Sequence, residues 1–143
     1  MDALKFINAK SKGKRQPVYV LSGDEDFLKR QCRTIIESHI LGDTDPAYAL
    51  TVFDGEELDF STIRNEVDSV SFFSDVRLVI VEHAEDFVTK FRPALEKYVA
   101  EPSSVGVVVL DVKSFPATTK LAKALPEEAH IVCKAPPDYR LPL

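Results

Sequence analysis

Short runs of apolar residues alternate with longer amphipathic stretches along the chain. The apolar runs are typical of strands that are covered on both faces. Five are expected, at residues 17–21, 49–53, 76–81, 105–110 and 130–133. Between them apolar residues recur every three or four positions, which predicts helices. We therefore expect an α/β domain with a mostly parallel five-stranded sheet and helices on both faces.

The first long helix follows the strand at residues 17–21. Ser22 and Glu25 have the spacing of a capping box, and Gly42 is expected to end the helix after about Leu41. Its packed face is expected to contain Leu28, Cys32, Ile35, Ile36, His39 and Ile40.

Three further helices are expected. One begins after Asp59 and carries inward apolar residues as far as Val70. Another covers residues 86–99, where Pro93 should kink the helix or open its second segment. A short one covers residues 118–125.

The net charge of −5 is distributed unevenly. Residues 1–15 contain five basic side chains and one acid, whereas residues 16–143 contain 13 basic and 22 acidic groups, a net charge of −9. This acidic excess argues against binding of nucleic acid by the domain alone. We expect a basic flexible arm at 1–15, a folded domain at 16–135, and the start of a Pro-rich linker at 136–143.

The composition is that of a globular protein with a single domain. The chain has 143 residues, of which 45% are hydrophobic and 29% charged, and no apolar run reaches the ~20 residues of a membrane span. Cys32 and Cys133 both lie in apolar stretches, so we expect buried thiols in the cytoplasm rather than a disulfide framework.

The turn after the first strand lacks the residues of a nucleotide site. A phosphate-binding loop needs several glycines followed by Lys and Ser or Thr. Here Gly23 is followed by three carboxylates, at Asp24, Glu25 and Asp26, and no GxGxxG or GK[ST] occurs in the chain. We expect no bound nucleotide and no other cofactor.

Charged residues at predicted strand ends suggest an alternative site. The set comprises Asp24, Asp26, Glu82, Asp111 and Lys134. Carboxyl ends of parallel strands converge, so these groups could form an acidic, Mg²⁺-dependent, phosphoryl-accepting pocket like that of a response-regulator receiver. Glu82 stands where such a pocket needs Asp, and no Ser or Thr ends the fourth strand.

The histidines do not indicate catalysis. His39, His83 and His130 lack metal-ligand spacing with Cys or Asp partners, and no Gly-x-Ser-x-Gly occurs. We interpret the chain as a binding module and not as an enzyme.

Two adjacent aromatic residues stand out before the third strand. Phe72 and Phe73 follow the apolar face that ends at Val70, and neighbours on a helix point about 100° apart. At least one ring should therefore be exposed or partly exposed, as in an anchor that enters a partner's pocket. The alternative is that both rings fold over the edge of the sheet.

Several segments together form a recognisable series. They are PVYVLSGDEDFL at residues 17–28, the Phe-Phe segment followed by DVRLVIVE at 75–82, CKAP at 133–136 and Leu-Pro at 141–142. In the order and spacing of these segments the chain resembles the delta subunit of the bacterial DNA polymerase III clamp loader, over about residues 16–143.

This resemblance implies an AAA+-type, RecA-like first domain whose phosphate loop has decayed. It also implies that Val70, Phe72 and Phe73 dock into the hydrophobic cleft of the sliding clamp and help to open it during replication. Other loader subunits would be partners and supply ATP, DNA would be contacted only through the assembled loader, and the lid and collar domains of delta subunits would be absent from these residues.

Overall fold

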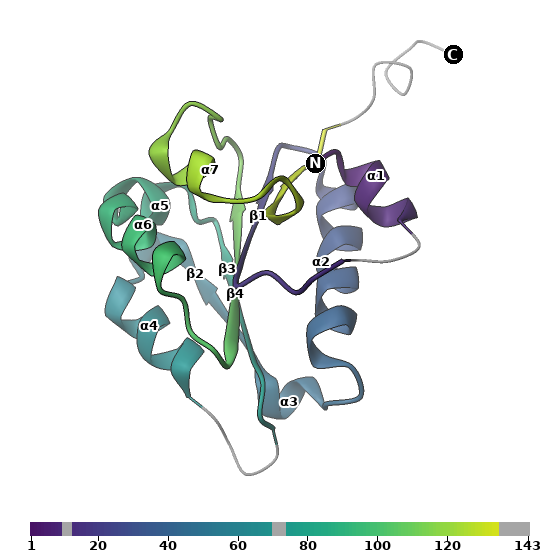
Figure 1. Cartoon of the computed structure of the whole chain (residues 1–143), viewed down its shortest axis with the longest axis vertical. Helices are drawn as coiled ribbons and strands as arrows, with labels where there is room; N and C mark the ends of the chain where they lie inside the picture. Colours follow the sequence, from purple (N-terminus) through teal and green to yellow (C-terminus); the bar gives the residue numbers. More distant parts are fainter. Residues whose placement is uncertain (10–12, 70–73, 135–143) are drawn as a thin grey trace.

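A computed structural model describes residues 1–9, 13–69 and 74–134 of the chain. Its centre is a five-stranded sheet made of β1 (Val18–Ser22), β2 (Leu50–Asp54), β3 (Arg77–Glu82), β4 (Gly106–Val112) and β5 (His130–Val132). The strand order is β2-β3-β4-β1-β5, and every neighbouring pair is parallel (Figure 1). The predicted α/β fold is confirmed, and each strand lies within one or two residues of its expected place.

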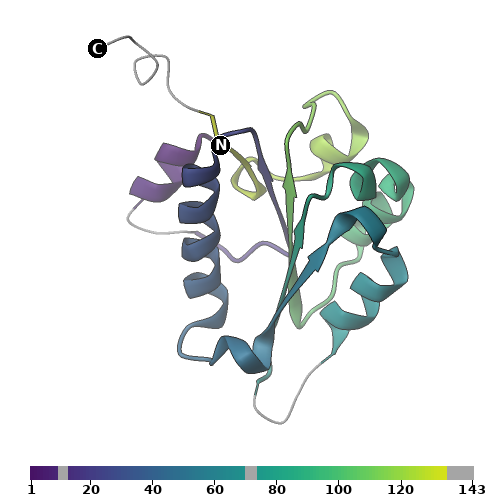
Figure 2. The ribbon, with the colours of Figure 1, turned by 180° about the vertical axis from the view of Figure 1, so that it is seen from behind.

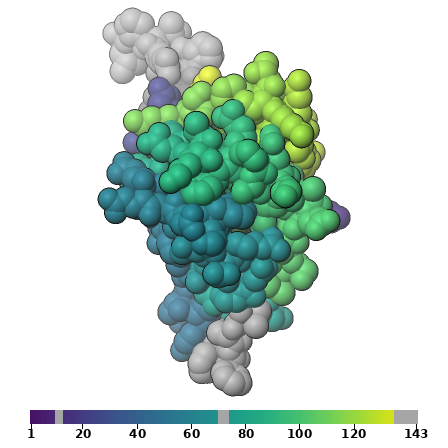
Figure 3. All heavy atoms as spheres, turned by 90° about the vertical axis from the view of Figure 1, so that its left-hand side faces the viewer, coloured from purple at the N-terminus to yellow at the C-terminus, as the bar shows by residue number. Residues whose placement is uncertain are grey.

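Helices cover both faces of the sheet (Figures 1 and 2). One face carries α1 (Ala3–Asn8), α2 (Asp26–Leu41) and α3 (Pro46–Ala49). The other carries α4 (Phe60–Asp68), α5 (Glu85–Lys90), α6 (Arg92–Ala100) and α7 (Lys120–Ala124), and this is the side that faces the viewer in Figure 3. Two 3-10 helices, η1 (Gly55–Glu57) and η2 (Glu127–Ala129), precede α4 and β5. None of the described helices has the length and apolar character needed to cross a membrane.

Each inner strand contributes to two cores. In β1, Tyr19 and Leu21 pack with α1 and α2, whereas Val18 and Val20 pack with α4, α5 and α6. All five residues of β1 are buried. This double burial explains why the strands appear in the sequence as continuous apolar runs rather than as alternating patterns.

Helix α2 begins later than the predicted capping box. Its N-cap is Glu25, whose side chain accepts a hydrogen bond from the N–H of Phe27. Ser22 is instead the last residue of β1, and its Oγ lies 2.8 Å from Nε2 of His130. The packed face of α2 is confirmed except for His39, which is exposed because the buried stripe follows Leu28, Cys32, Ile36 and Ile40 at intervals of four.

The helical stretch predicted at residues 86–99 is two helices. α5 ends at Lys90, and α6 starts at Arg92 with Pro93 in its first turn. Proline is tolerated there because the first N–H groups of a helix have no intrahelical partner. Pro93 therefore opens the second segment, one of the two predicted outcomes.

The predicted flexible arm at residues 1–15 is wrong for its first part. Residues 3–8 form α1, which packs against α2 through the buried side chains of Ala3 and Phe6. The ammonium group of Met1 donates to the carbonyl of His130 at 2.6 Å, and the N–H of Val132 donates to the carbonyl of Met1 at 2.7 Å. Residues 1–9 thus belong to the folded domain, and Asp2 makes a single parallel bridge with Val132 of β5.

Candidate functional sites at the two ends of the sheet

The turn between β1 and α2 lies at the carboxyl end of the sheet, where parallel α/β folds bind ligands. The N–H of Gly23 donates to the carbonyl of Lys113, and the N–H of Glu25 donates to the carbonyl of Cys133, each at 3.1 Å. Gly23 has φ +116, and a Cβ at this position would lie 2.2 Å from the carbonyl oxygen of Cys133. Only glycine fits here. Backbone from the ends of β4 and β5 therefore closes the turn.

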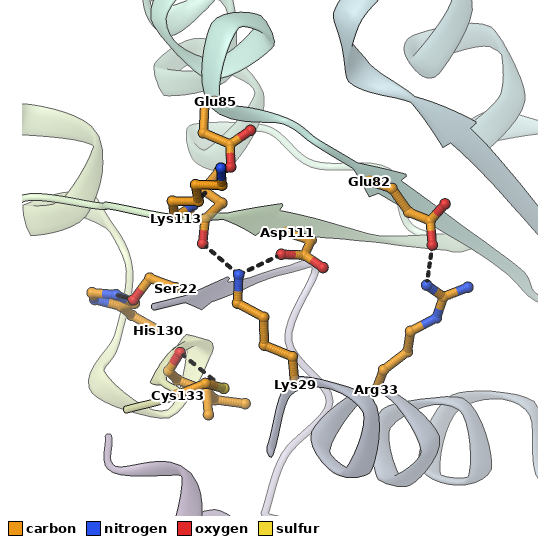
Figure 4. Close-up of polar contacts among 11 residues, drawn as sticks. Ser22, Lys29, Arg33, Glu82, Glu85, Asp111, Lys113, His130 and Cys133 are labelled. Carbon is orange, nitrogen blue, oxygen red and sulfur yellow. Dashed lines mark hydrogen bonds and ion pairs between the residues drawn. The ribbon is translucent and has the colours of Figure 1, made fainter. Parts of the chain in front are cut away.

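Lys29 joins α2 to β4 at this end. Its Nζ lies 2.7 Å from Oδ1 of Asp111 and donates to the carbonyl of Val112 at 2.9 Å (Figure 4). The side chains of Lys29 and Asp111 are 9% and 29% exposed. Such a pair is costly to break, because loss of one partner leaves a charge in a place that water hardly reaches.

Arg33, one turn further along α2, makes a second link. Its Nη1 lies 2.7 Å from Oε2 of Glu82 at the end of β3, and its Nε lies 3.5 Å from Oε1 of Glu37. The Arg33 and Glu82 side chains are more exposed than the Lys29 pair, at 26% and 43%. Two cations of α2 are thus neutralised by carboxylates from neighbouring strands.

The acidic pocket predicted at this end does not form. Glu82 and Asp111 are each held by a cation of α2, while Asp24, Asp26 and Lys134 are exposed. Among residues 1–9, 13–69 and 74–134, the group of three or more His, Cys and acidic side chains whose ligand atoms all lie within 4.8 Å of one another consists of Asp54, Glu56 and His83. None of these three belongs to the predicted pocket, so the structure gives the receiver-like alternative no support.

His83 and His130 each make a side-chain hydrogen bond, with Asp54 and Ser22, whereas His39 is exposed on α2. Nδ1 of His83 lies 3.3 Å from Oδ2 of Asp54, and this hydrogen bond raises the pKa of His83. The pKa of Asp54 is lowered, first by the N–H of Glu56 and then by His83. Burial lowers the pKa of His130, with a smaller contribution from the N-terminal ammonium group.

The two cysteines are buried thiols from α2 and the end of β5. A hydrogen bond with Cys32, followed by burial, raises the pKa of the Cys133 thiol. Because the thiolate is the nucleophilic form, Cys133 has no character of a reactive cysteine.

The connection from α4 to β3 lies at the opposite, amino end of the sheet. The predicted anchors Val70, Phe72 and Phe73 lie outside the described residues. Their flanks are described. Ser69 ends α4, and its Oγ donates to the carbonyl of Glu66 at 2.7 Å.

The flank on the other side is held in a similar way. Oγ of Ser74 donates to the carbonyl of Val76 at 2.8 Å and accepts from the N–H of Val76 at 3.1 Å. Ser74 is buried. The polypeptide therefore has a fixed course immediately before β3.

Arg77, the first residue of β3, joins the two flanks. Its Nε donates to the carbonyl of Ser69 at 3.4 Å, and its Nη1 lies 3.5 Å from Oε1 of Glu66. The same carboxylate oxygen accepts from Oγ1 of Thr51 in β2 at 2.8 Å. Side chains of two strands thus fix the end of α4.

The start of β4 sets the height of α4 above the sheet. A Cβ on Gly106 would lie 2.2 Å from the carbonyl oxygen of Val67, so only glycine allows this approach. Oγ of Ser103 also donates to the Val67 carbonyl, at 3.3 Å. The last turn of α4 is therefore positioned by backbone contact.

Sequence reasoning overlooked Lys29, which has the most buried charged group at the carboxyl end. A usable signal was present, because Gly23 and Lys29 are separated by five residues, as are the first glycine and the lysine of a phosphate-binding loop. The full motif also has a second glycine and a Ser or Thr, and Leu28 and Arg30 occupy those two positions here.

Comparison with known proteins decides the family. The family model described as "DNA polymerase III, delta subunit" matches residues 19–134. The chain belongs to this family. The match includes both the closed β1–α2 turn and the connection between α4 and β3, and it agrees with the resemblance found in the sequence.

Individual relatives agree with this assignment. DNA polymerase III subunit delta of Bacillus subtilis (strain 168) is 28% identical over 131 residues, which are 85% of this chain and 38% of the relative. The structure of a Bacillus subtilis DNA clamp loader delta protein superposes with a TM-score of 0.68 at 28% identity, covering 91% of this chain and 40% of that one. The chain therefore spans about two fifths of the length of these relatives.

A more distant structure supports the fold alone. A DNA polymerase III gamma subunit-related protein of Thermotoga maritima superposes with a TM-score of 0.57 at 18% identity, covering 96% of this chain and 46% of that one. The RecA-like sheet is thus shared beyond the delta proteins.

Proposed function

We propose that this domain binds the sliding clamp through Val70, Phe72 and Phe73 and favours a clamp in which one interface is open. It acts as a non-catalytic binding module of a cytoplasmic clamp loader. Other loader subunits supply ATP hydrolysis, and DNA is met only through the assembled loader.

The observation that carries this proposal is that the residues on both sides of 70–73 are held by contacts within the domain. Arg77 contacts both Ser69 and Glu66, and Ser74 is buried beside Val76. A segment whose ends are fixed loses less conformational freedom on binding than a free tail does. Membership in the delta family supports a sliding clamp as the class of partner, since the solved delta relative is described as a clamp loader protein.

A double substitution tests the binding surface. Phe72→Ala with Phe73→Ala should weaken clamp binding about a thousandfold, because two anchors of about 2 kcal/mol each are removed and 1.4 kcal/mol is a factor of ten. Affinity is measured by titrating a clamp from the same organism. The melting temperature of the variant should stay near that of the parent.

Phe27→Ala is the matched control for this experiment. Phe27 is also an aromatic residue, is 57% exposed, and lies at the carboxyl end of the sheet. Its loss should leave clamp affinity unchanged. Equal binding by the parent and the double variant would refute the anchor assignment.

Clamp opening needs a separate measurement. A fluorophore pair placed across one clamp interface should report a longer distance when the domain is added in excess. The double variant should leave that distance unchanged at the same concentration. Tight binding without any change in distance would refute opening while leaving the binding surface in place.

A further inference from the structure

The β1–α2 turn keeps part of the spacing of a phosphate-binding loop. In such loops a glycine is followed after five residues by a lysine, with a second glycine before the lysine and Ser or Thr after it. Gly23 and Lys29 have this spacing, whereas Leu28 and Arg30 occupy the other two positions. The lysine of the pattern is present, whereas its second glycine and its hydroxyl residue are not.

The RecA-like fold implies a nucleotide at this turn, and the residues present do not fit one. The N–H groups of Gly23 and Glu25, which would have to bind phosphate, already donate to the carbonyls of Lys113 and Cys133. The Cys133 carbonyl lies so close to Gly23 that even a Cβ there would come within 2.2 Å of its oxygen. The turn therefore offers a nucleotide none of these backbone N–H donors.

The ammonium group of Lys29 nevertheless has the surroundings of an anion-binding group. Its side chain is 9% exposed, and its partners are one carboxylate oxygen of Asp111 and the carbonyl of Val112. A buried ammonium group requires a negative partner. Asp111 provides that partner from the end of β4, and the neighbouring Arg33 is neutralised separately by Glu82 (Figure 4).

We propose that the carboxylate of Asp111 is a resident anion that takes the place of a bound phosphate at Lys29. It neutralises the lysine and repels phosphate-containing ligands. With a neutral amide in its place, the ammonium group lacks a charged partner, and the site gains affinity for a small phosphate anion. This proposal is independent of clamp binding, because it concerns the other end of the sheet.

Asp111→Asn tests the proposal with inorganic pyrophosphate as the probe. Melting temperatures are measured with pyrophosphate at millimolar concentration and with chloride at equal ionic strength, and binding is followed by titration calorimetry. The parent should shift by less than about 1 °C, whereas Asp111→Asn should rise by about 4 °C at ten times its dissociation constant. A folded Asp111→Asn protein without this rise, or a parent with an equal rise, would overturn the proposal.

Two controls separate Lys29 from other cations. Glu82→Gln frees Arg33 at the same end of the sheet and should show no pyrophosphate response, because Arg33 retains Glu37 and is more exposed. Lys29→Met combined with Asp111→Asn removes the ammonium group and should abolish the response. A response that persists in the double variant places the anion elsewhere and refutes the assignment.

A folding defect would also be informative. If Asp111→Asn is unfolded in chloride, pyrophosphate should restore its far-UV circular dichroism, and the double variant should fold without pyrophosphate. Failure of pyrophosphate to restore the fold counts against the proposal.

Discussion

At the carboxyl end of the sheet, Lys29 and Arg33 reach from α2 to the ends of β4 and β3. At the amino end, Arg77 reaches from the start of β3 back to the last residues of α4. In the first set, the ammonium group of Lys29, which a nucleotide phosphate would need, is already paired with Asp111. The second set fixes the flanks of residues 70–73, the segment that we propose contacts a clamp. One sheet can therefore have its ligand-binding groups occupied at one end while contacts at the other end hold these flanks in place.

Among the substitutions that test this comparison, Gly106→Ala should have the largest effect on stability and on clamp binding. The new Cβ would lie 2.2 Å from the carbonyl oxygen and 2.4 Å from Cγ2 of Val67, so the last turn of α4 has to move. We expect a loss of about 3 kcal/mol in the free energy of unfolding and, for the folded protein, at least roughly tenfold weaker clamp binding. Urea unfolding and a clamp titration measure the two effects. Unchanged affinity would show that the position of the end of α4 does not affect clamp binding.

Gly23→Ala is the counterpart at the carboxyl end. Its Cβ would meet the Cys133 carbonyl at 2.2 Å, in a backbone conformation that favours glycine. We expect a loss of about 2–3 kcal/mol, slightly below that of Gly106→Ala, because β5 is a short edge strand that can shift. Clamp affinity of the folded fraction should equal that of the parent. A matching loss of affinity would show that the two ends are coupled.

The two ion pairs of α2 should differ in strength. Asp111→Ala strands the buried ammonium group of Lys29 and should cost about 2 kcal/mol, less than for a fully buried pair because Asp111 is partly exposed. Glu82→Ala removes the partner of the more exposed Arg33 and should cost at most about 0.5 kcal/mol. Urea unfolding of both variants at pH 7 tests the order. Equal losses would mean that burial does not distinguish the pairs.

The smallest expected effect is a pH dependence from His130. Burial and the N-terminal ammonium group lower its pKa below the ordinary 6.5, so the unfolded chain takes up a proton more readily than the folded one. Its contribution to stability is present above pH 6.5 and is lost as the pH falls through the lowered pKa. The free energy of unfolding should change less between pH 7.5 and pH 5.5 in His130→Gln than in the parent. The raised pKa of His83 stabilises the folded state as the pH falls, which opposes the effect of His130. The test is therefore the comparison between His130→Gln and the parent, not the pH dependence of the parent alone.

Much of the fold could be predicted because burial on both faces leaves a strong local signal. The run Val18–Leu21 is entirely apolar and is buried entirely. The N-terminal helix was missed because counting charges at residues 1–15 outweighed a short apolar pattern, in which Ala3 and Phe6 are three apart and both buried. The cap of α2 was misplaced because Ser22 bonds to His130, a residue 108 positions away.

In the candidate sites, too, features that depend on adjacent residues could be predicted and those that depend on distant residues could not. The absence of a working phosphate loop could be predicted from the glycines, since it depends on adjacent residues. The pairing of Lys29 with Asp111 could not, because 82 positions separate them and only the sheet brings them together. The anchors Val70, Phe72 and Phe73 stay a prediction that mutagenesis has to test.

The position of Arg77 has a consequence for the proposed recognition of a clamp. Since this one guanidinium group contacts both Ser69 and Glu66, the start of β3 is tied to the end of α4 within the folded domain. Bringing the two ends of a loop together costs conformational entropy, and these contacts meet that cost before any partner arrives. In the proposed function, a clamp therefore binds between two ends that already have a fixed separation.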